Sequence, residues 1–208
     1  MGSQERRMRE KELRREHILD TARDLLFQKG INAATMNRIA RKAELSVGTL
    51  YLYFKNKEDL YAALQEEGLE ILHAMIVQVS SRPAEPLQKL EDIALAYLEF
   101  SERHRTYYEI INYFLTAPDV VFPPHLKERI DEHGNRTLAL LDEVLGQLLP
   151  GRPDAKALRR ASLVFWATIH GMLQFRKLQN TILKGEDFHG LYVHAASCVI
   201  RGLVQEGR

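Results

Sequence analysis

Residues 35–60 read TMNRIARKAELSVGTLYLYFKNKEDL, and this stretch decides the fold of the N-terminal part of the chain. Apolar residues recur at helical spacing in two short segments, 36–43 and 47–53, and a turn separates the two. A third helix is expected to begin after Asn56. Two short helices joined by a tight turn form a helix-turn-helix, a motif used mainly to place its second helix in the major groove of DNA.

The motif is supported by helix caps and by an apolar inner face. Thr35, Ser46 and Asn56 each offer a side-chain oxygen that can accept a hydrogen bond at a helix N-terminus. The residues expected to face inward are Met36, Ile39, Ala40, Ala43, Leu50 and Phe54. The residues expected to face outward are Asn37, Arg38, Arg41, Val47, Gly48, Thr49, Tyr51 and Tyr53. Gly48 lowers helix stability by about 1 kcal/mol relative to alanine, but it lets the backbone approach DNA closely.

This stretch resembles the tetracycline-repressor (TetR) family of bacterial transcription regulators, over about residues 13–60. The family pattern is Thr, Ile-Ala, Ala-Gly-Val-Ser, Gly-x-Leu-Tyr-x-Tyr/His-Phe and Lys-Glu-x-Leu. The matching residues are Thr35, Ile39, Ala40, Ala43, Leu45, Ser46, Gly48, Leu50, Tyr51, Tyr53, Phe54, Lys57, Glu58 and Leu60. Glu44 departs from the pattern, because the family usually has glycine in the turn. We expect Glu44 to adopt a less favourable backbone conformation, or the turn to differ slightly.

The resemblance implies two kinds of DNA contact. Phosphate contacts are expected from Thr35, Ser46, Tyr51, Tyr53 and Lys57. Base-edge contacts are expected from Asn37, Val47 and Thr49, with the backbone of Gly48 close to the duplex. Hydroxyl and ammonium groups hold phosphates without reading sequence, whereas asparagine pairs with adenine and methyl groups contact thymine. The alternative for each tyrosine, taken alone, is half-buried packing.

The charge distribution agrees with a DNA-binding N-terminus. The 208 residues carry a net charge of only +1. Residues 1–57 hold 13 Lys and Arg against 7 Asp and Glu, a net charge of +6, while residues 58–208 hold 16 against 21, a net charge of −5. A basic N-terminal part suits contact with phosphates, and the acidic remainder does not.

The remaining sequence has helical spacing almost throughout and lacks alternating strand patterns. Further helices are predicted at about 9–28, 57–80, 86–103, 105–116, 125–149, 155–179 and 188–205, with the charged N-terminal arm extending the first. The predicted fold is therefore all-α. It consists of a three-helix DNA-binding domain with the helix-turn-helix (1–56) and a six-helix ligand-binding and dimerisation domain (57–208).

The last two predicted helices, 155–179 and 188–205, are apolar on nearly every side. Such helices are buried on more than one face, and a second copy of the chain is an economical partner. TetR-like proteins dimerise through their last two long helices, so the resemblance also implies a homodimer. The two copies of the helix-turn-helix in such a dimer can then read a palindromic operator. The alternative is one larger monomeric core, and Cys198, within the second apolar run, is expected to be buried.

Aromatic and aliphatic residues in the middle of the chain are candidates for an apolar cavity with a few polar contacts. The candidate ligand-binding residues are Met75, Tyr97, Phe100, His104, Tyr108, Ile111, Phe114, Trp166, Ile169, His170 and Leu173. Residue by residue, the alternative is ordinary core packing. The resemblance implies a small-molecule effector, expected to be lipophilic or amphipathic, that releases a repressor from its operator. Tilting of the 57–80 helix would transmit the signal.

Other classes of protein find less support. The sequence lacks a Gly-rich phosphate loop, HExxH and Cys-x-x-Cys, so neither an enzyme nor a cofactor is predicted. The eight histidines are scattered, and no metal site is predicted. One cysteine, a charged N-terminus and no apolar run long enough for a bilayer favour a cytoplasmic protein. The alternative function is an architectural or adaptor helix-turn-helix protein without an effector.

Overall fold

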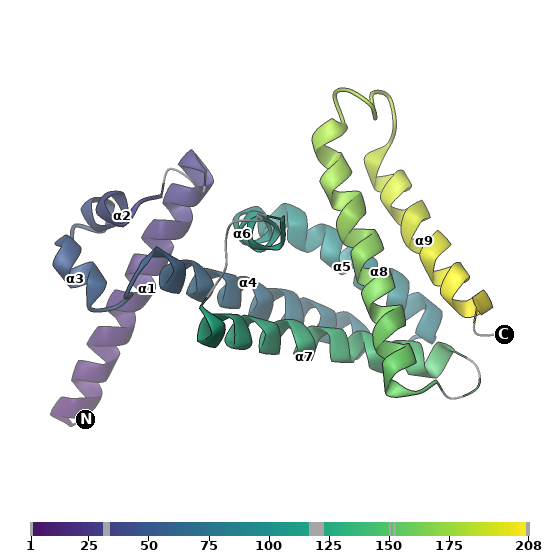
Figure 1. Cartoon of the computed structure of the whole chain (residues 1–208), viewed down its shortest axis with the longest axis horizontal. Coiled ribbons are helices and arrows are strands. Elements are labelled where there is room, and N and C mark those ends of the chain that lie inside the picture. The colour runs from purple at the N-terminus through teal and green to yellow at the C-terminus, as the bar shows by residue number, and fades with distance from the viewer. Residues whose placement is uncertain (1, 31–33, 117–122, 150, 152, 207–208) are drawn as a thin grey trace. The chain divides into compact units, whose positions relative to one another are not determined.

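The computed structural model describes residues 2–30, 34–116, 123–149, 151 and 153–206 (Figure 1). Within these ranges the chain forms nine α-helices, a short 3-10 helix and no strand, which confirms the all-α prediction. The elements are α1 Ser3–Lys29, α2 Met36–Lys42, α3 Val47–Tyr51, α4 Lys57–Ser80, α5 Pro86–Arg103, α6 Arg105–Thr116, α7 Pro124–Leu148, α8 Ala155–Phe175, η2 Arg176–Leu178 and α9 Phe188–Glu206. None of these helices combines the length and the apolarity needed to cross a membrane.

Local capping determines where the first helices begin. The side-chain oxygens of Thr35, Ser46 and Asn56 accept hydrogen bonds from the backbone N–H three residues further on, at 3.3, 3.0 and 2.7 Å. Each bond satisfies an N–H that has no partner within its helix. At the other end of α1, Gly30 has a φ of 76° and its N–H bonds to the carbonyl of Leu26, so the helix stops where predicted.

Two predicted helix ends were wrong by a few residues. The second motif helix ends at Tyr51 rather than at residue 53, because the N–H groups of Leu52 and Tyr53 bond to carbonyls three residues back. The helix predicted to reach residue 179 ends at Phe175 and continues as η2. In both places the last turn tightens into 3-10 geometry without a glycine or proline to mark the change.

The described chain divides by internal contacts into two compact units. Residues 1–68 and 105–130 form one, which we call the head unit, and residues 69–104 and 131–208 form the other, the body unit. The divisions fall inside α4 and α7, so each of these helices contributes to both units. The domain boundary predicted after residue 56 separates two functions, whereas this division follows internal contacts. The contact division therefore does not test that boundary, which remains a prediction.

In the head unit, α1 packs against α2 and α6, and α2 packs against α3 (Figure 1). The core of α1 is the apolar stripe that includes Ile18, Ala22 and Leu26, all nearly inaccessible to solvent. Tyr61 of α4 donates a hydrogen bond to the carbonyl of Ala34 at 3.1 Å, just before α2. Burial raises the pKa of Tyr61, so the phenol stays protonated and remains a donor.

In the body unit, α8 and α9 lie side by side and both contact α5 (Figure 1). Tyr192 of α9 is fully buried and donates a hydrogen bond to the carbonyl of Ala94 at 2.9 Å, which ties α9 to α5. Cys198, expected to be buried, is exposed on the described chain. The inward stripe of α9 runs through Tyr192, Ala196 and Ile200, and this spacing places Cys198 on the opposite side.

Candidate nucleic-acid interface

The inner face of the helix-turn-helix is as predicted. Six apolar side chains pack into the head unit and are buried: Met36, Ile39, Ala40, Ala43, Leu50 and Phe54. The guanidinium of Arg15 covers the ring of Phe54 at 5.4 Å from the ring centre. These contacts hold α3 against α1 and α2, so the opposite side of α3 is presented outward.

The turn between α2 and α3 carries backbone strain at Glu44. Its φ is 56°, and among the described residues it is the one non-glycine residue with positive φ. The N–H of Leu45 bonds to the carbonyl of Ala40 at 2.9 Å, which holds the turn closed. The expectation of an unfavourable backbone at this position is therefore confirmed. Glycine would adopt the same angles without the steric cost.

Replacing Glu44 with glycine is expected to raise the free energy of unfolding. The relief of left-handed strain exceeds the extra chain entropy of glycine, and the net gain is about 0.5–1 kcal/mol. Glu44→Ala is the matched control, because it removes the carboxylate and keeps the strain. Urea unfolding of the three proteins measures the difference, and a glycine variant no more stable than the alanine variant would contradict the assignment.

The predicted DNA-contacting residues lie on the outer side of the motif. Asn37, Gly48 and the caps Thr35 and Ser46 are exposed, and the Tyr51 side chain is 49% exposed. A further group is partly exposed: Val47, Thr49, Tyr53 and Lys57. The hydroxyls of Thr49 and Ser46 lie 2.8 Å apart, so the cap fixes the rotamer of Thr49. The nine predicted residues are thus brought together along α2, α3 and the first turn of α4.

Lys57 opens α4 and its ammonium lies 4.9 Å from the centre of the Tyr61 ring. The cation–π contact limits the movement of the long side chain. A held cation next to a helix N-terminus, where backbone N–H groups also point outward, is a suitable place for a phosphate. The buried hydroxyl of Tyr61 in turn connects this end of α4 to the start of α2.

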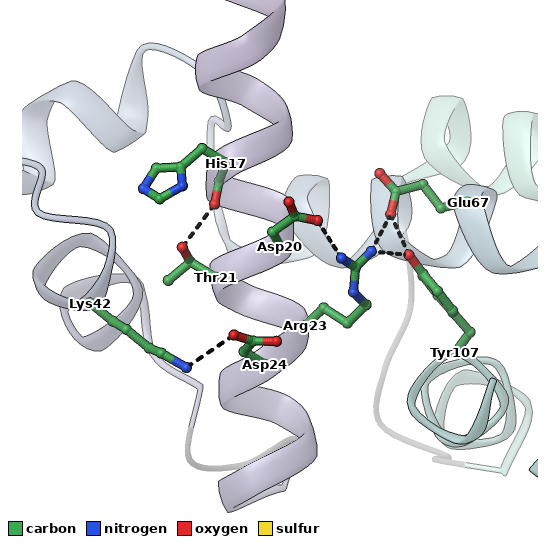
Figure 2. Close-up of polar contacts among 8 residues, drawn as sticks. All are labelled: His17, Asp20, Thr21, Arg23, Asp24, Lys42, Glu67 and Tyr107. Atoms are coloured by element: carbon green, nitrogen blue, oxygen red, sulfur yellow. Dashed lines mark hydrogen bonds and ion pairs between the residues drawn. The ribbon is translucent and has the colours of Figure 1, made fainter. Parts of the chain in front are cut away.

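A basic pocket of about 450 Å³ flanks α2. It is lined by Leu25, Lys29, Arg38, Arg41 and Lys42. Asp24 pairs with the ammonium of Lys42 at 3.6 Å and offsets one of the four charges (Figure 2). The concentration of cationic side chains makes this side of the head unit attractive to phosphates.

One exposed residue of the motif was missed by the sequence reasoning. Leu52, the C-cap of α3, is 80% exposed, more than any other large apolar side chain among the described residues. The signal that marks it is its place in the helix, two residues after the buried Leu50, which turns it away from the core.

A polar junction ties α1 to α4 and α6 within the head unit (Figure 2). Arg23 of α1 donates hydrogen bonds to Asp20 and to the hydroxyl of Tyr107, and its guanidinium lies 3.8 Å from the Glu67 carboxylate. Tyr107 donates to Glu67 at 2.9 Å. Burial raises the pKa of Glu67, and the neighbouring Tyr107 and Arg23 oppose that rise. Gly68 allows the close approach, because a Cβ there would lie 2.9 Å from that of Tyr107.

The predicted ligand-binding residues fall into two groups. Five residues of the body unit form a chain of neighbouring rings: Trp166, His170, Tyr97, Phe100 and His104. His104 and Met75 also line a groove of about 430 Å³ between α4 and α5. Ile169 and Leu173 are buried on α8.

The second group lies on α6, in the head unit. Tyr108 and Ile111 are buried, and the ring of Phe114 makes edge-to-face contacts with Tyr61 and Tyr113 at 5.9 and 5.2 Å between ring centres. Their role in binding a ligand remains a prediction, as does that of the body-unit residues.

His170 is expected to make stability depend on pH. Burial lowers its pKa, and its Nδ1 lies 2.7 Å from the Tyr97 hydroxyl. As the pH falls below the usual value of about 6.5, the unfolded chain takes up a proton that the folded imidazole resists, so the free energy of unfolding decreases. Urea unfolding at pH 7.5 and 5.5 should show a smaller decrease for His170→Gln. His73, whose pKa is also lowered by burial, remains in both proteins. An equal decrease in both would contradict the assignment.

A capped helix-turn-helix whose outer face carries hydroxyls, an amide and cations, joined to a helical body, is the arrangement typical of DNA-binding transcriptional regulators. Comparison with known proteins agrees. A family profile described as "Bacterial regulatory proteins, tetR family" matches residues 18–64, and one described as "Tetracyclin repressor-like, C-terminal domain" matches residues 90–187. The chain belongs to the TetR family.

Relatives support the same conclusion. The regulator AcrR of Shigella flexneri is 33% identical over 101 residues, covering 47% of each chain. The repressor KstR2 of Mycobacterium tuberculosis is 31% identical over 91 residues, covering 44% of this chain and 46% of that one. The chain thus spans about half the length of these curated relatives. The structure of FadR of Bacillus subtilis, solved with stearoyl-CoA, matches this chain with a TM-score of 0.67 at 22% identity. The match covers 91% of this chain and 97% of that one, and it shows that the two share a fold.

Proposed function

We propose that this regulator is a repressor that binds a palindromic operator as a homodimer and is released by a small lipophilic or amphipathic effector. The observation that carries the proposal is the outer face of the helix-turn-helix, where nine predicted contact residues meet on a firmly packed head. Thr35, Ser46, Tyr51, Tyr53 and Lys57 hold phosphates. Asn37, Val47 and Thr49 approach base edges, with the Gly48 backbone between them.

Dimerisation through α8 and α9 is supported by the side of α8 that faces away from its own core. The inward stripe contains Phe165, Ile169 and Leu173, and the opposite stripe is also apolar although exposed. The exposed large side chains of the two helices are Leu163, Val164, Phe175 and Val193. Covering them with the same surface of a second chain removes apolar area from water and brings two heads to one operator.

The proposed effector site consists of the five neighbouring rings of the body unit, Trp166 to His104 in the order given above, together with the groove that His104 also lines. The Tyr97 hydroxyl and the partly buried imidazole of His170 supply a polar contact among aromatic rings. Charged side chains such as Arg82 and Glu99 line the groove, so the combination suits an amphipathic ligand. FadR of Bacillus subtilis was solved with stearoyl-CoA, so a long-chain acyl-CoA is the first effector to test. Aromatic compounds and drugs are the other candidates.

The proposed coupling runs through α4. This helix starts at the predicted phosphate contact Lys57 and contributes to both units. An effector that binds one arrangement of the body more tightly shifts the population towards it, and a change in α4 then moves the two heads out of register with the operator. An effector with equal affinity for both arrangements would shift nothing.

Selection of genomic fragments by the purified protein tests the proposal. A short palindrome should be enriched, and its affinity should fall steeply as salt rises because several phosphates are contacted. Stearoyl-CoA should then weaken binding to that palindrome. Enrichment without any shared sequence would support the architectural alternative, and no enrichment would reject DNA regulation. Unchanged affinity with stearoyl-CoA would reject acyl-CoA as the effector while leaving the DNA-binding proposal in place.

A further inference from the structure

Leu52 is an apolar residue on the outer surface of the head unit, where it contributes little to the packing of the core. Its side chain is 80% exposed, whereas the neighbouring Leu50 and Phe54 are buried in the core of the head unit. Truncating so exposed a side chain costs the fold little, so packing does not explain why an aliphatic residue stands there. The nearby outward positions of α2 and α3 carry polar groups, a glycine, a tyrosine and the partly exposed Val47, so Leu52 is the most exposed aliphatic group on this surface.

The local backbone geometry places Leu52 on the outward face of the motif. Its backbone continues the helical conformation, with φ of −72° and ψ of −22°, and its N–H bonds to the carbonyl of Thr49 at 3.1 Å. Leu52 follows the buried Leu50 by two residues, which turns it away from the core and towards the side on which the exposed Gly48 lies. Gly48 has no side chain, and its immediate surroundings on the outer side are open except for the Ser46 hydroxyl. Leu52 therefore points away from the core, on the same side as the exposed backbone of Gly48.

The chemistry of the major groove supplies a partner for such a group. Thymine differs from the other bases there by its 5-methyl group, and apolar side chains recognise it by direct contact. An aliphatic side chain has no hydrogen bond to offer to phosphate or to other base edges. The hydroxyls and cations of this face can position the duplex but do not sense the thymine methyl, a contact open to the aliphatic groups of Val47, Thr49 and Leu52.

We propose that Leu52 is a specificity-determining residue that contacts the 5-methyl group of a thymine in each operator half-site. The inference rests on the proposed function, because it requires an operator read by α3. It adds a base contact that the sequence reasoning did not include.

Uracil substitution in the operator tests the contact one methyl group at a time. Each thymine of the selected palindrome is replaced by uracil in both half-sites, and affinity is measured for the wild-type protein and for Leu52→Ala. At one symmetric position, uracil should lower the operator affinity of the wild type about fourfold per half-site, which is the factor expected for one buried methyl group. At the same position, uracil should lower the operator affinity of Leu52→Ala less than about 1.5-fold. Thymines contacted by Val47 or Thr49 should stay sensitive in both proteins, and they serve as internal controls.

Ile182→Ala provides the matched protein control. Ile182 is 76% exposed and lies in the body unit, so its truncation removes a similar aliphatic surface far along the chain from α3. It should change neither operator affinity nor the uracil profile, and both alanine variants should unfold at the wild-type temperature. If every thymine that is sensitive in the wild type is equally sensitive in Leu52→Ala, the inference is overturned and the proposed function stands. If selection yields no operator, both are overturned.

Discussion

Replacing Tyr51, Tyr53 and Lys57 together with alanine is expected to lower operator affinity by at least about 100-fold. Each neutral hydrogen bond to a phosphate is worth about 1 kcal/mol and each charged one about 1.5–3 kcal/mol. Two hydroxyls and one ammonium in a single head therefore account for about 3 kcal/mol or more, and every tenfold change corresponds to about 1.4 kcal/mol. A dimer loses these contacts in both heads, so the measured effect should exceed that of one.

The fold should tolerate this triple substitution, because the three side chains lie on the outer face of the motif. Tyr51 is exposed, and Tyr53 and Lys57 are partly exposed. Fluorescence anisotropy with labelled operator measures the affinity, and thermal unfolding checks the fold. Tyr51→Phe with Tyr53→Phe is the matched variant, since it keeps both rings and removes only the hydroxyls. If the correctly folded triple variant bound the operator with wild-type affinity, the proposal that this face contacts DNA would be rejected.

The lysine contribution can be separated by salt. Replacing Lys57 with glutamine removes one phosphate charge per head, so the slope of log affinity against log salt should become shallower by about 1 for each head. The hydroxyl variants should lower affinity without changing that slope. This difference distinguishes a charge held against phosphate from a general weakening of the head.

Features set by neighbouring residues were predictable from the sequence. The caps Thr35, Ser46 and Asn56 act on N–H groups three residues away, and the buried face of α2 and α3 follows from helical spacing. The strain at Glu44 was predictable because a family pattern supplied the glycine for comparison. The ends of α3 and α8 were not, since nothing in the local composition marks where a helix tightens into 3-10 geometry.

Contacts between distant residues were beyond the reach of the sequence. Arg23 and its partner Tyr107 are 84 residues apart, and no spacing rule relates α1 to α6. For the same reason the predicted ligand-binding residues of α6 were placed in one group with those of α5 and α8, although they lie in different compact units. Leu52 was assigned to neither face of the motif, although its place two residues after the inward Leu50 turns it outward.

Introducing glutamate at Val164 is expected to abolish the proposed dimer. Val164 is 43% exposed in the single chain, and the proposal covers it with the partner's apolar surface. A carboxylate buried there without a partner costs several kcal/mol, enough to dissociate a dimer at working concentrations. Joining two heads multiplies affinity by about 10²–10⁴ through effective concentration, so a monomer should bind the palindrome at least about 100-fold more weakly. Sedimentation measures the mass, 24.0 kDa for one chain, and anisotropy measures the affinity.

Leu87→Glu is the matched control for this experiment. Leu87 of α5 is also 43% exposed, but it lies outside the proposed interface, so its replacement should leave both the dimer and the affinity unchanged. Val193→Glu tests α9 in the same way as Val164→Glu tests α8. Both variants place the charge on a surface that is open in the single chain, so each monomer should stay folded. A wild-type protein that sediments as a single chain at micromolar concentration, or two glutamate variants that remain dimeric, would show that the apolar side of α8 and α9 has another purpose.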